Sequence, residues 1–319
     1  MPRTPRARPG ARVKRNLSLR DAWYYTAGIG FLALAKAKNL ARGYSTPKPF
    51  DLSDAARCID YDLKVVEGWM RGLASYTGDG TFLAGRNVLE LGPGSDLGVG
   101  IVLLARGAGS YNACDVNALA KHAPRSFYEA LFARLAQAYP TGDIERLRAE
   151  LDALEAGVPS KLRYTVRESL DLAAAVGTGT MDLVVSQAAF EHFDDVESVV
   201  RELSRVCRPG AVLVAEIDLK THSRWIRDRD PNNIYRYPDV IYDAFHFRGS
   251  PNRVRPHQYR EVFECCGWTN IHVSPLTRLD AACHGSNGMS LRFADAVNQM
   301  DYLTILLCAT KRRESNQWT

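Results

Sequence analysis

The stretch VLELGPGSDLGVG at residues 88–100 decides the fold. An apolar run at residues 87–91 passes into a Gly-Pro-Gly turn at residues 92–94, and a second apolar run follows soon afterwards. We predict a strand over residues 87–91, a tight turn, and a helix over residues 98–106. Such a turn stands at the carboxyl end of a strand, which is where open α/β sheets bind their ligands.

The residues of the turn indicate what kind of ligand it holds. Gly92 and Gly94 let a ligand approach the backbone more closely than a Cβ would allow, and Glu90 adds a fixed negative charge. That charge would oppose the pyrophosphate of a nicotinamide nucleotide, whose fingerprint also needs a glycine where this chain has Leu97. S-adenosylmethionine (SAM), which carries a sulfonium and an ammonium group, is favoured instead.

A second carboxylate supports the same ligand. Asp115 follows an apolar run at residues 110–114, about twenty residues after the glycine turn, which is the spacing of an acid that binds ribose hydroxyls. The glycines could instead serve only the packing of a strand against a helix. Glu90 before the turn and Asp115 after it favour the cofactor site.

Strands and helices alternate through most of the remaining chain, which indicates a parallel sheet covered by helices. Pro140 and Gly142 divide a charged helical stretch at residues 126–155, which we interpret as an inserted helical hairpin. Further strands are predicted at residues 162–166, 181–186, 211–216, 270–273 and 302–309, and helices at residues 51–73 (capped by Ser53), 196–206 and 258–266.

The order of these motifs resembles that of the class I SAM-dependent methyltransferases over residues 65–311. The resemblance implies an α/β, Rossmann-like fold with a seven-stranded mixed sheet, whose last strand is antiparallel, and SAM as the cofactor. The positions that match the family's cofactor contacts are Glu168 and Ser169 for adenine, and Ser186 and Gln187 for the methionine part. An ion pair with the adjacent Arg167 would be an alternative role for the first of them.

We expect one methyltransferase domain with an N-terminal addition and two insertions. Members of the family usually place substrate-recognising additions after the fifth strand, and long irregular segments are often functional. The expected segments are a disordered basic tail (1–20), a helical extension (21–80), the domain (81–311) with insertions at about 120–160 and 218–256, and a C-terminal tail (312–319).

The net charge of +5 belongs to the N-terminal tail. Seven arginine and lysine residues precede the first acid, Asp21, and they exceed the whole surplus. The body therefore gives no electrostatic reason to bind nucleic acid, and we regard a nucleic-acid partner as unlikely. The cysteines are odd in number and lack zinc-binding spacing, which fits a reducing, cytoplasmic compartment.

Residues 22–40 form a largely apolar segment between this tail and the body. The apolar run is too short to span a bilayer, and its flanks do not fit a signal peptide. A helix there could pack on the body or lie on a membrane surface. We favour packing slightly, and peripheral membrane contact stays open.

Two histidines follow the strands that would face the transferable methyl group. His192 comes shortly after the fourth strand, and His222 lies four residues after Asp218 at the end of the fifth. Either could take the proton of a hydroxyl acceptor, because histidine is the usual base near neutral pH. Glu191 and Asp218 could join them around a divalent cation, but no spacing specifies such a site, and we expect no metal.

The predicted function is methyl transfer to a small molecule or a saccharide, at oxygen. An RNA methyltransferase is one alternative, although Ser-Gln-Ala-Ala at residues 186–189 replaces the N-P-P-[YF] loop of base-methylating enzymes. A non-catalytic scaffold at a membrane is another, and the oligomeric state stays open. Aromatic and basic residues after residue 218 could clamp an acceptor or form ordinary salt bridges; they are Trp225, Arg227, Arg229, Tyr235, Arg236, Tyr237, His246 and Arg253.

Overall fold

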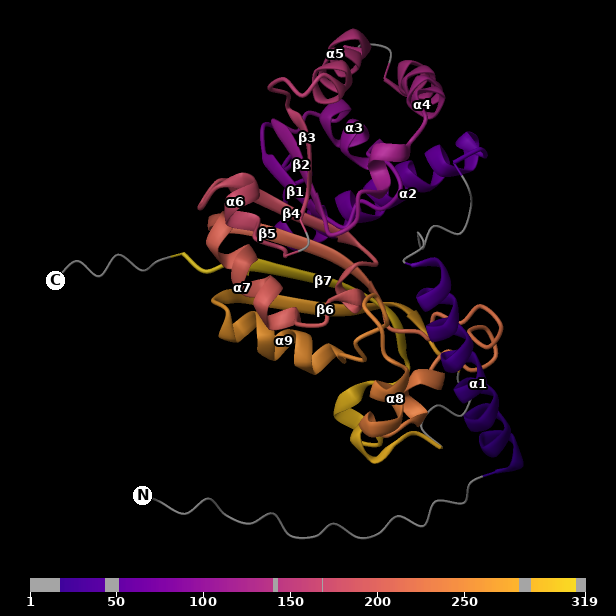
Figure 1. The fold of residues 1–319 in the computed structure, drawn as a ribbon. Coiled ribbons are helices and arrows are strands. Elements are labelled where there is room, and N and C mark those ends of the chain that lie inside the picture. Colours follow the sequence, from indigo (N-terminus) through magenta and orange to yellow (C-terminus); the bar gives the residue numbers. More distant parts are fainter. Residues whose placement is uncertain (1–17, 44–51, 140–142, 168, 281–287, 314–319) are drawn as a thin grey trace, which may run out of the picture.

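A seven-stranded sheet in the order β3-β2-β1-β4-β5-β7-β6 forms the centre of the molecule (Figure 1). Strands β1 to β5 pair in parallel, and β7 runs antiparallel to β5 and β6. This mixed sheet confirms the predicted Rossmann-like fold. The strands are β1 (Asn87–Leu91), β2 (Ser110–Asp115), β3 (Leu162–Val166), β4 (Met181–Gln187), β5 (Cys207–Asp218), β6 (Trp268–Arg278) and β7 (Tyr302–Lys311).

The structure is a computed structural model that describes residues 18–43, 52–139, 143–167, 169–280 and 288–313. Most of the predicted N-terminal tail, the end of the C-terminal tail and Glu168 therefore lie outside the described residues. No helix in the described ranges combines the length and the apolar character that crossing a membrane requires.

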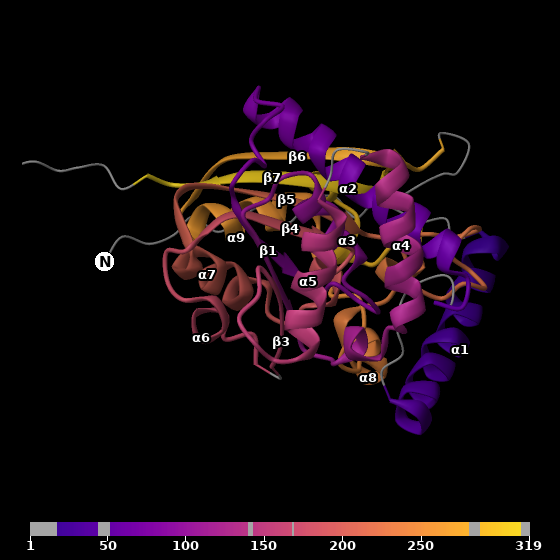
Figure 2. The same cartoon turned by 90° about the horizontal axis from the view of Figure 1, so that it is seen from above.

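Helices cover both faces of the sheet (Figures 1 and 2). Side chains alternate along a strand, so Val88 packs in one layer and Leu89 in the other. Both layers are apolar, as in other parallel sheets that are covered on two sides. One layer holds α2 (Ala55–Thr77), α3 (Gly98–Ala105), α4 (Arg125–Ala138) and α5 (Ile144–Glu155); the other holds α6 (Leu172–Val176), α7 (Val196–Val206) and α9 (Pro256–Cys265).

Both ends of α2 differ from the prediction. Asp54, and not Ser53, is the N-cap, and its carboxylate accepts a hydrogen bond from the backbone N–H of Arg57 at 3.4 Å. The helix runs past residue 73 because Leu73 is itself buried in the core. It ends where Gly78 takes a φ of 70°, a left-handed conformation that glycine adopts easily.

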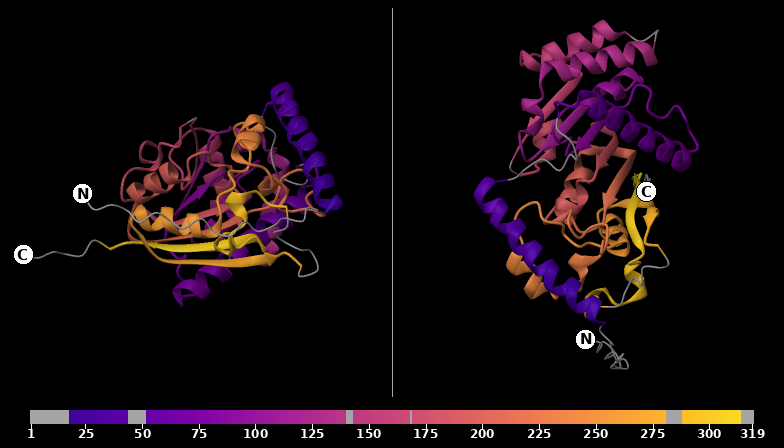
Figure 3. Two further views of the ribbon diagram at one scale, coloured as in Figure 1. Left: turned by 90° about the horizontal axis from the view of Figure 1, so that it is seen from below. Right: turned by 90° about the vertical axis from the view of Figure 1, so that its right-hand side faces the viewer.

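Helix α1 (Leu19–Arg42) lies along the outside of the molecule (Figure 3). Tyr25, Ile29 and Leu32 pack against a small apolar cluster formed mainly by the segment after β5. Helix α1 comes close to this segment at Gly28, where an added Cβ would lie 2.0 Å from the hydroxyl oxygen of Tyr237. Packing on the body, the interpretation favoured from the sequence, is what the structure shows for this face.

Ion pairs of two buried arginines hold the segment between β5 and α9 together. Arg236 binds Asp230 at 2.7 Å and Asp21 of α1 at 3.0 Å, and Arg253 binds Asp239. Tyr235 and Tyr237 are buried as well, so these four members of the suggested acceptor clamp stabilise the fold instead. The remaining short elements are η1 (Leu119–His122), η2 (Phe190–His192), η3 (Asn233–Arg236), α8 (Asp239–Phe245), η4 (Leu291–Phe293) and η5 (Ala296–Asn298).

Candidate active site

A cavity of about 870 Å³ lies at the carboxyl ends of β1, β2 and β4. Two predicted site residues, Ser186 and His222, are not part of its lining, and Glu168 lies outside the described residues. The predicted residues that do line it are Glu90, Gly92, Gly94, Asp115, Ser169, Gln187 and His192.

The glycine turn after β1 leaves room for a ligand. Gly92 and Gly94 have φ angles of 71° and 79°, which side chains other than glycine tolerate poorly. A Cβ on Gly92 would lie 2.7 Å from the Cβ of Ala189, in the loop after β4, so the two loops meet closely there. A Cβ on Gly94 would meet nothing within 4 Å, which leaves open space above this residue.

Glu90 is held in place by a buried tyrosine. Its side chain is buried and accepts a hydrogen bond from the hydroxyl of Tyr111 on β2. Burial and the charge of Glu90 raise the pKa of Tyr111 well above its usual value, so the hydroxyl keeps its proton. Gly100 in α3 makes room for this ring, because a Cβ there would lie 2.3 Å from it. The last glycine of the motif therefore serves packing.

Asp115 closes the turn from the side of β2. One carboxylate oxygen accepts the backbone N–H of Asn117 at 2.9 Å. Burial raises the pKa of Asp115, while hydrogen bonds from backbone N–H groups, including that of Gly94, lower it. A buried carboxylate beside an open glycine turn fits the ribose hydroxyls of SAM, which would donate hydrogen bonds to it.

The end of β4 contributes one polar group to the cavity and one to the sheet. Oε1 of Gln187 is buried and has no hydrogen-bond partner in the part of the chain that the structure describes, which leaves an acceptor for a ligand. Ser186 is fully buried, and its hydroxyl donates to the carbonyl of Leu91 at 3.1 Å. Ser186 therefore links β4 to β1 and has no position on the cavity wall.

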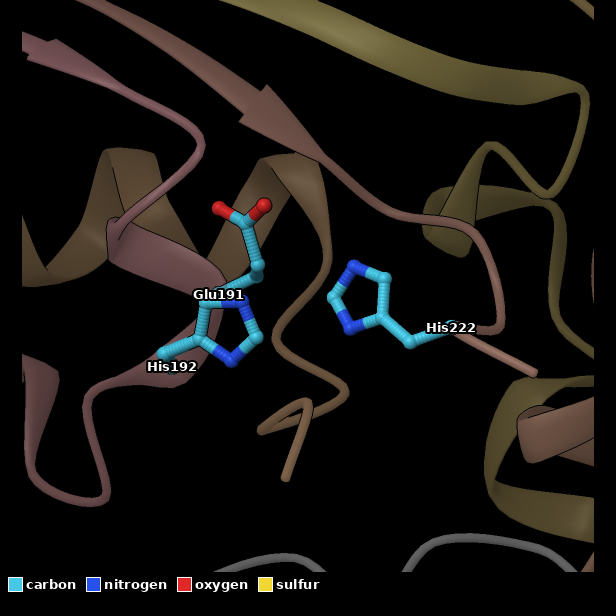
Figure 4. Close-up of side chains that lie close together, drawn as sticks. All are labelled: Glu191, His192 and His222. Atoms are coloured by element: carbon cyan, nitrogen blue, oxygen red, sulfur yellow. The ribbon is translucent and has the colours of Figure 1, made fainter. Parts of the chain in front are cut away.

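The two candidate histidines lie together (Figure 4), although only His192 lines the cavity. His192 ends η2, and its ring stacks on that of His222, with centroids 4.8 Å apart and planes 23° apart. Nδ1 of His192 lies 2.6 Å from the carbonyl oxygen of Gly249. Burial lowers the pKa of both histidines, and that of His222 lies well below its usual value, so both rings are neutral at neutral pH.

A buried carboxylate completes this group. Among the described residues no side chain pairs with either oxygen of Glu191, and burial together with the charge of Asp218 raises its pKa well above the usual value, although nearby backbone N–H groups lower it. Asp218 itself binds Arg227. One ligand atom from each of Glu191, His192 and His222 can be chosen so that all three lie within 4.8 Å of one another.

Asn252 positions η2, and it was not predicted from the sequence as a site residue. Its side-chain amide donates to the carbonyls of Phe190 at 2.8 Å and Phe193 at 3.0 Å, and its backbone N–H donates to the carbonyl of Glu191 at 2.7 Å. The insertion after β5 therefore holds η2 in place. A lone asparagine in a loop gives no pattern from which this contact could be predicted.

Comparison with known proteins adds a partial family match. Residues 143–215, from the start of the hairpin's second helix into β5, match the family model described as a methyltransferase domain. A putative sarcosine dimethylglycine methyltransferase from Galdieria sulphuraria is similar at 17% identity, over 78% of this chain and 86% of that chain, with a TM-score of 0.44.

Two further solved structures are similar at lower identity. One is a SAM-dependent methyltransferase from Mesorhizobium loti, at 14% identity over 72% of this chain and 92% of that chain, with a TM-score of 0.41. The other is phosphoethanolamine N-methyltransferase 2 from Haemonchus contortus, at 13% identity over 80% of this chain and 53% of that chain, with a TM-score of 0.44. The methyl acceptors that the names of these similar proteins mention are the acceptors of those proteins.

Proposed function

We propose that the protein is a class I SAM-dependent methyltransferase and that it transfers a methyl group to a hydroxyl oxygen of a small molecule or a saccharide. The observation that carries the proposal is the stacked pair of half-buried histidines beside the cavity that the glycine turn and Asp115 line. A hydroxyl acceptor must lose a proton when its oxygen is methylated, and an imidazole can take that proton.

The residues that would hold the cofactor lie on three strand ends. SAM supplies, when bound, a methyl group that its sulfonium already activates. Gly92 and Gly94 would let it approach the backbone closely, and Asp115 would accept hydrogen bonds from its ribose. Gln187 offers its unpaired Oε1 to the methionine part. The protein's main task is then to position the acceptor.

In the ion-free protein, His192 is the residue that would take the acceptor's proton. Its Nδ1–H donates to the carbonyl of Gly249, which fixes the tautomer and leaves the lone pair on Nε2. Stacking on His222 restricts rotation of the ring. Asn252 holds the turn on which His192 stands, so the base is positioned by the insertion after β5.

Two measurements test the proposal. Calorimetry should detect binding of S-adenosylhomocysteine, and Asp115→Asn should weaken it. Mass spectrometry on panels of hydroxyl, amine and carbon acceptors should then find methylation of a hydroxyl compound, which His192→Gln slows strongly. Absence of S-adenosylhomocysteine binding, or methylation of amines alone at a rate that His192→Gln leaves unchanged, would contradict the proposal.

We also propose that α1 contacts an anionic membrane surface on the cytoplasmic side. Large apolar side chains on its outer face are exposed: Leu19 by 94%, Trp23 by 69%, Leu34 by 59% and Leu40 by 78%. The only acid of the helix, Asp21, turns inward to Arg236. An apolar face flanked by basic residues suits the surface of a bilayer with anionic lipids.

A second copy of the chain fits this face less well than a membrane. The residues before α1 include six arginines and lysines and no acid, so two copies would bring like charges together. Flotation with phosphatidylserine-containing vesicles should retain the protein, less so at high salt, and a Trp23→Ser/Leu34→Ser/Leu40→Ser variant should lose binding. The control, Val240→Ser/Leu291→Ser, removes equally exposed side chains elsewhere. Dimerisation without flotation would contradict this proposal.

A further inference from the structure

We propose that Glu191, His192 and His222 form a binding site for a divalent first-row transition-metal cation. The three side chains converge from two chain segments, η2 and the loop after β5 (Figure 4). The role assigned below to the ion in the reaction depends on the proposed O-methylation, whereas the ion site itself depends only on these residues.

Glu191 gives the strongest argument. Its side chain is 2% exposed, and among the described residues no side chain pairs with either carboxylate oxygen; the nearby donors are the backbone N–H groups of Glu191 and Asp218, which carry no charge. Burying an ionised carboxylate without a positive partner costs several kcal/mol. The basic side chains of the nearby loop, Lys220 and Arg227, pair with Asp218 instead. A bound cation would supply the missing positive charge.

The histidines are oriented as metal ligands usually are. Metal-binding histidines commonly donate their second N–H to a carbonyl or carboxylate, which leaves the other nitrogen free to bind the ion. His192 does so, since its Nδ1 lies 2.6 Å from the carbonyl oxygen of Gly249. Nδ1 of His222 is buried with no partner in the described ranges, and its Nε2 lies 3.9 Å from Oδ2 of Asp218, beyond hydrogen-bond distance. A lone pair is therefore available on each ring.

The set of ligands selects the class of ion. Two imidazoles and one carboxylate suit manganese, iron, cobalt or zinc, whereas magnesium and calcium prefer oxygen ligands alone. Three protein ligands also leave coordination positions open, as in catalytic metal sites. Because His192 lines the cavity, an open position can face the acceptor.

An ion at this site would change how the acceptor loses its proton. The acceptor hydroxyl would bind the cation, which lowers the pKa of that hydroxyl, and its proton would pass to water. The oxygen then forms a bond to the methyl carbon as the bond from sulfur to that carbon breaks. The products are the methyl ether, S-adenosylhomocysteine and one proton. The histidines act in this case as ligands.

The test is a titration of the chelator-treated full chain with Co²⁺ and Zn²⁺, followed by calorimetry and by the visible absorption of Co²⁺. We expect one ion per chain, and about 100-fold weaker binding in Glu191→Gln and in His222→Gln, since each removes one of three ligands. His272→Gln on β6 is the matched control and should bind as the parent does. Circular dichroism checks that each variant is folded.

The outcomes separate this inference from the proposed function. Failure of the parent protein to bind Co²⁺ or Zn²⁺, or equal binding by the parent and Glu191→Gln, would overturn the metal site. Full hydroxyl methylation by such an ion-free protein would leave the proposed function standing. Co²⁺ binding that both Glu191→Gln and His222→Gln weaken would support the site even when no hydroxyl compound is methylated, and the proposed function would then fail alone.

Discussion

The two halves of the cavity are built in different ways. The half proposed for the cofactor, called the cofactor half below, takes its main residues from one unit, β1 to β2, in which Glu90, the glycines and Asp115 follow one another closely in the chain. The half proposed for the acceptor, called the acceptor half below, joins η2 to the insertion after β5, and Asn252 binds the carbonyl of Phe190 across 62 positions. Residues that are close together in the chain form the first half. Hydrogen bonds between residues far apart in the chain hold the second half together. Variants in each half should therefore change different quantities.

The largest effect is expected in the acceptor half. His192→Gln should lower kcat by about 10²- to 10⁴-fold, the usual contribution of a positioned proton acceptor. Calorimetry should find the affinity for S-adenosylhomocysteine unchanged, because this residue does not belong to the cofactor half. An equal loss of kcat and of affinity for S-adenosylhomocysteine would contradict the division of the cavity into two halves. His272→Gln is the control for a general effect of removing a histidine.

The next effect belongs to the cofactor half. Asp115→Asn should weaken S-adenosylhomocysteine binding by about 10- to 100-fold, since hydrogen bonds to a charged group contribute about 1.5–3 kcal/mol. At saturating SAM, kcat should change much less. Asp228→Asn, at an exposed position in the insertion, serves as the control and should leave both values unchanged. A variant that keeps full affinity for S-adenosylhomocysteine but loses kcat would contradict the assignment of Asp115 to the cofactor half.

Gly92 is where the two halves touch, so its replacement should affect both. Gly92→Ala places a Cβ 2.7 Å from that of Ala189 and forces alanine into a positive φ, which costs roughly 1–2 kcal/mol. Gly107→Ala is matched for backbone strain, with φ of 98° and no atom within 4 Å of the added Cβ. Both variants should lose stability in urea, and only the first should lose cofactor affinity and kcat.

A smaller effect is expected from the residue that positions η2. Asn252→Ala removes the two hydrogen bonds from its side chain to Phe190 and Phe193, and should lower kcat by about tenfold while S-adenosylhomocysteine still binds fully. A lower free energy of unfolding should accompany it. If kcat is unchanged, the insertion contributes only to stability.

The smallest effect concerns pH. Burial raises the pKa of Asp115, so it takes up a proton at a higher pH than an exposed aspartate does. Because the protonated form is the poorer acceptor, affinity for S-adenosylhomocysteine should fall as pH is lowered from 7.5 to 5, and Asp115→Asn should show no such decline. Calorimetry at several pH values measures this, and an affinity that rises on acidification would contradict it.

The same contrast explains what could be predicted from the sequence. The strand, glycine turn and following acid lie within one chain unit, so their spacing alone predicted Glu90, Gly92, Gly94 and Asp115 as cavity residues, and the structure places all four on its wall. The alternation of strands and helices likewise predicted the sheet.

Long-range contacts explain what could not be predicted. Ser186 belongs to a strand end as expected, but the direction of its side chain depends on the neighbouring β1, to which it is bonded. Asn252 and Gly249 reach η2 from an irregular insertion with no periodic pattern. His192 and His222 were identified separately as candidates, yet their stacking could be seen only once β4 and β5 were placed side by side.

Helix α1 joins two surfaces that differ in character. Its outer face carries the exposed apolar side chains, while Asn39 and Gly43 near its C-terminal end line the cavity. If a surface that binds the outer face changes the affinity for the cofactor by some factor, the cofactor must change the affinity for that surface by the same factor. If the proposed membrane contact is coupled to the cavity in this way, cofactor saturation could be read from vesicle binding and vesicle binding from cofactor titration.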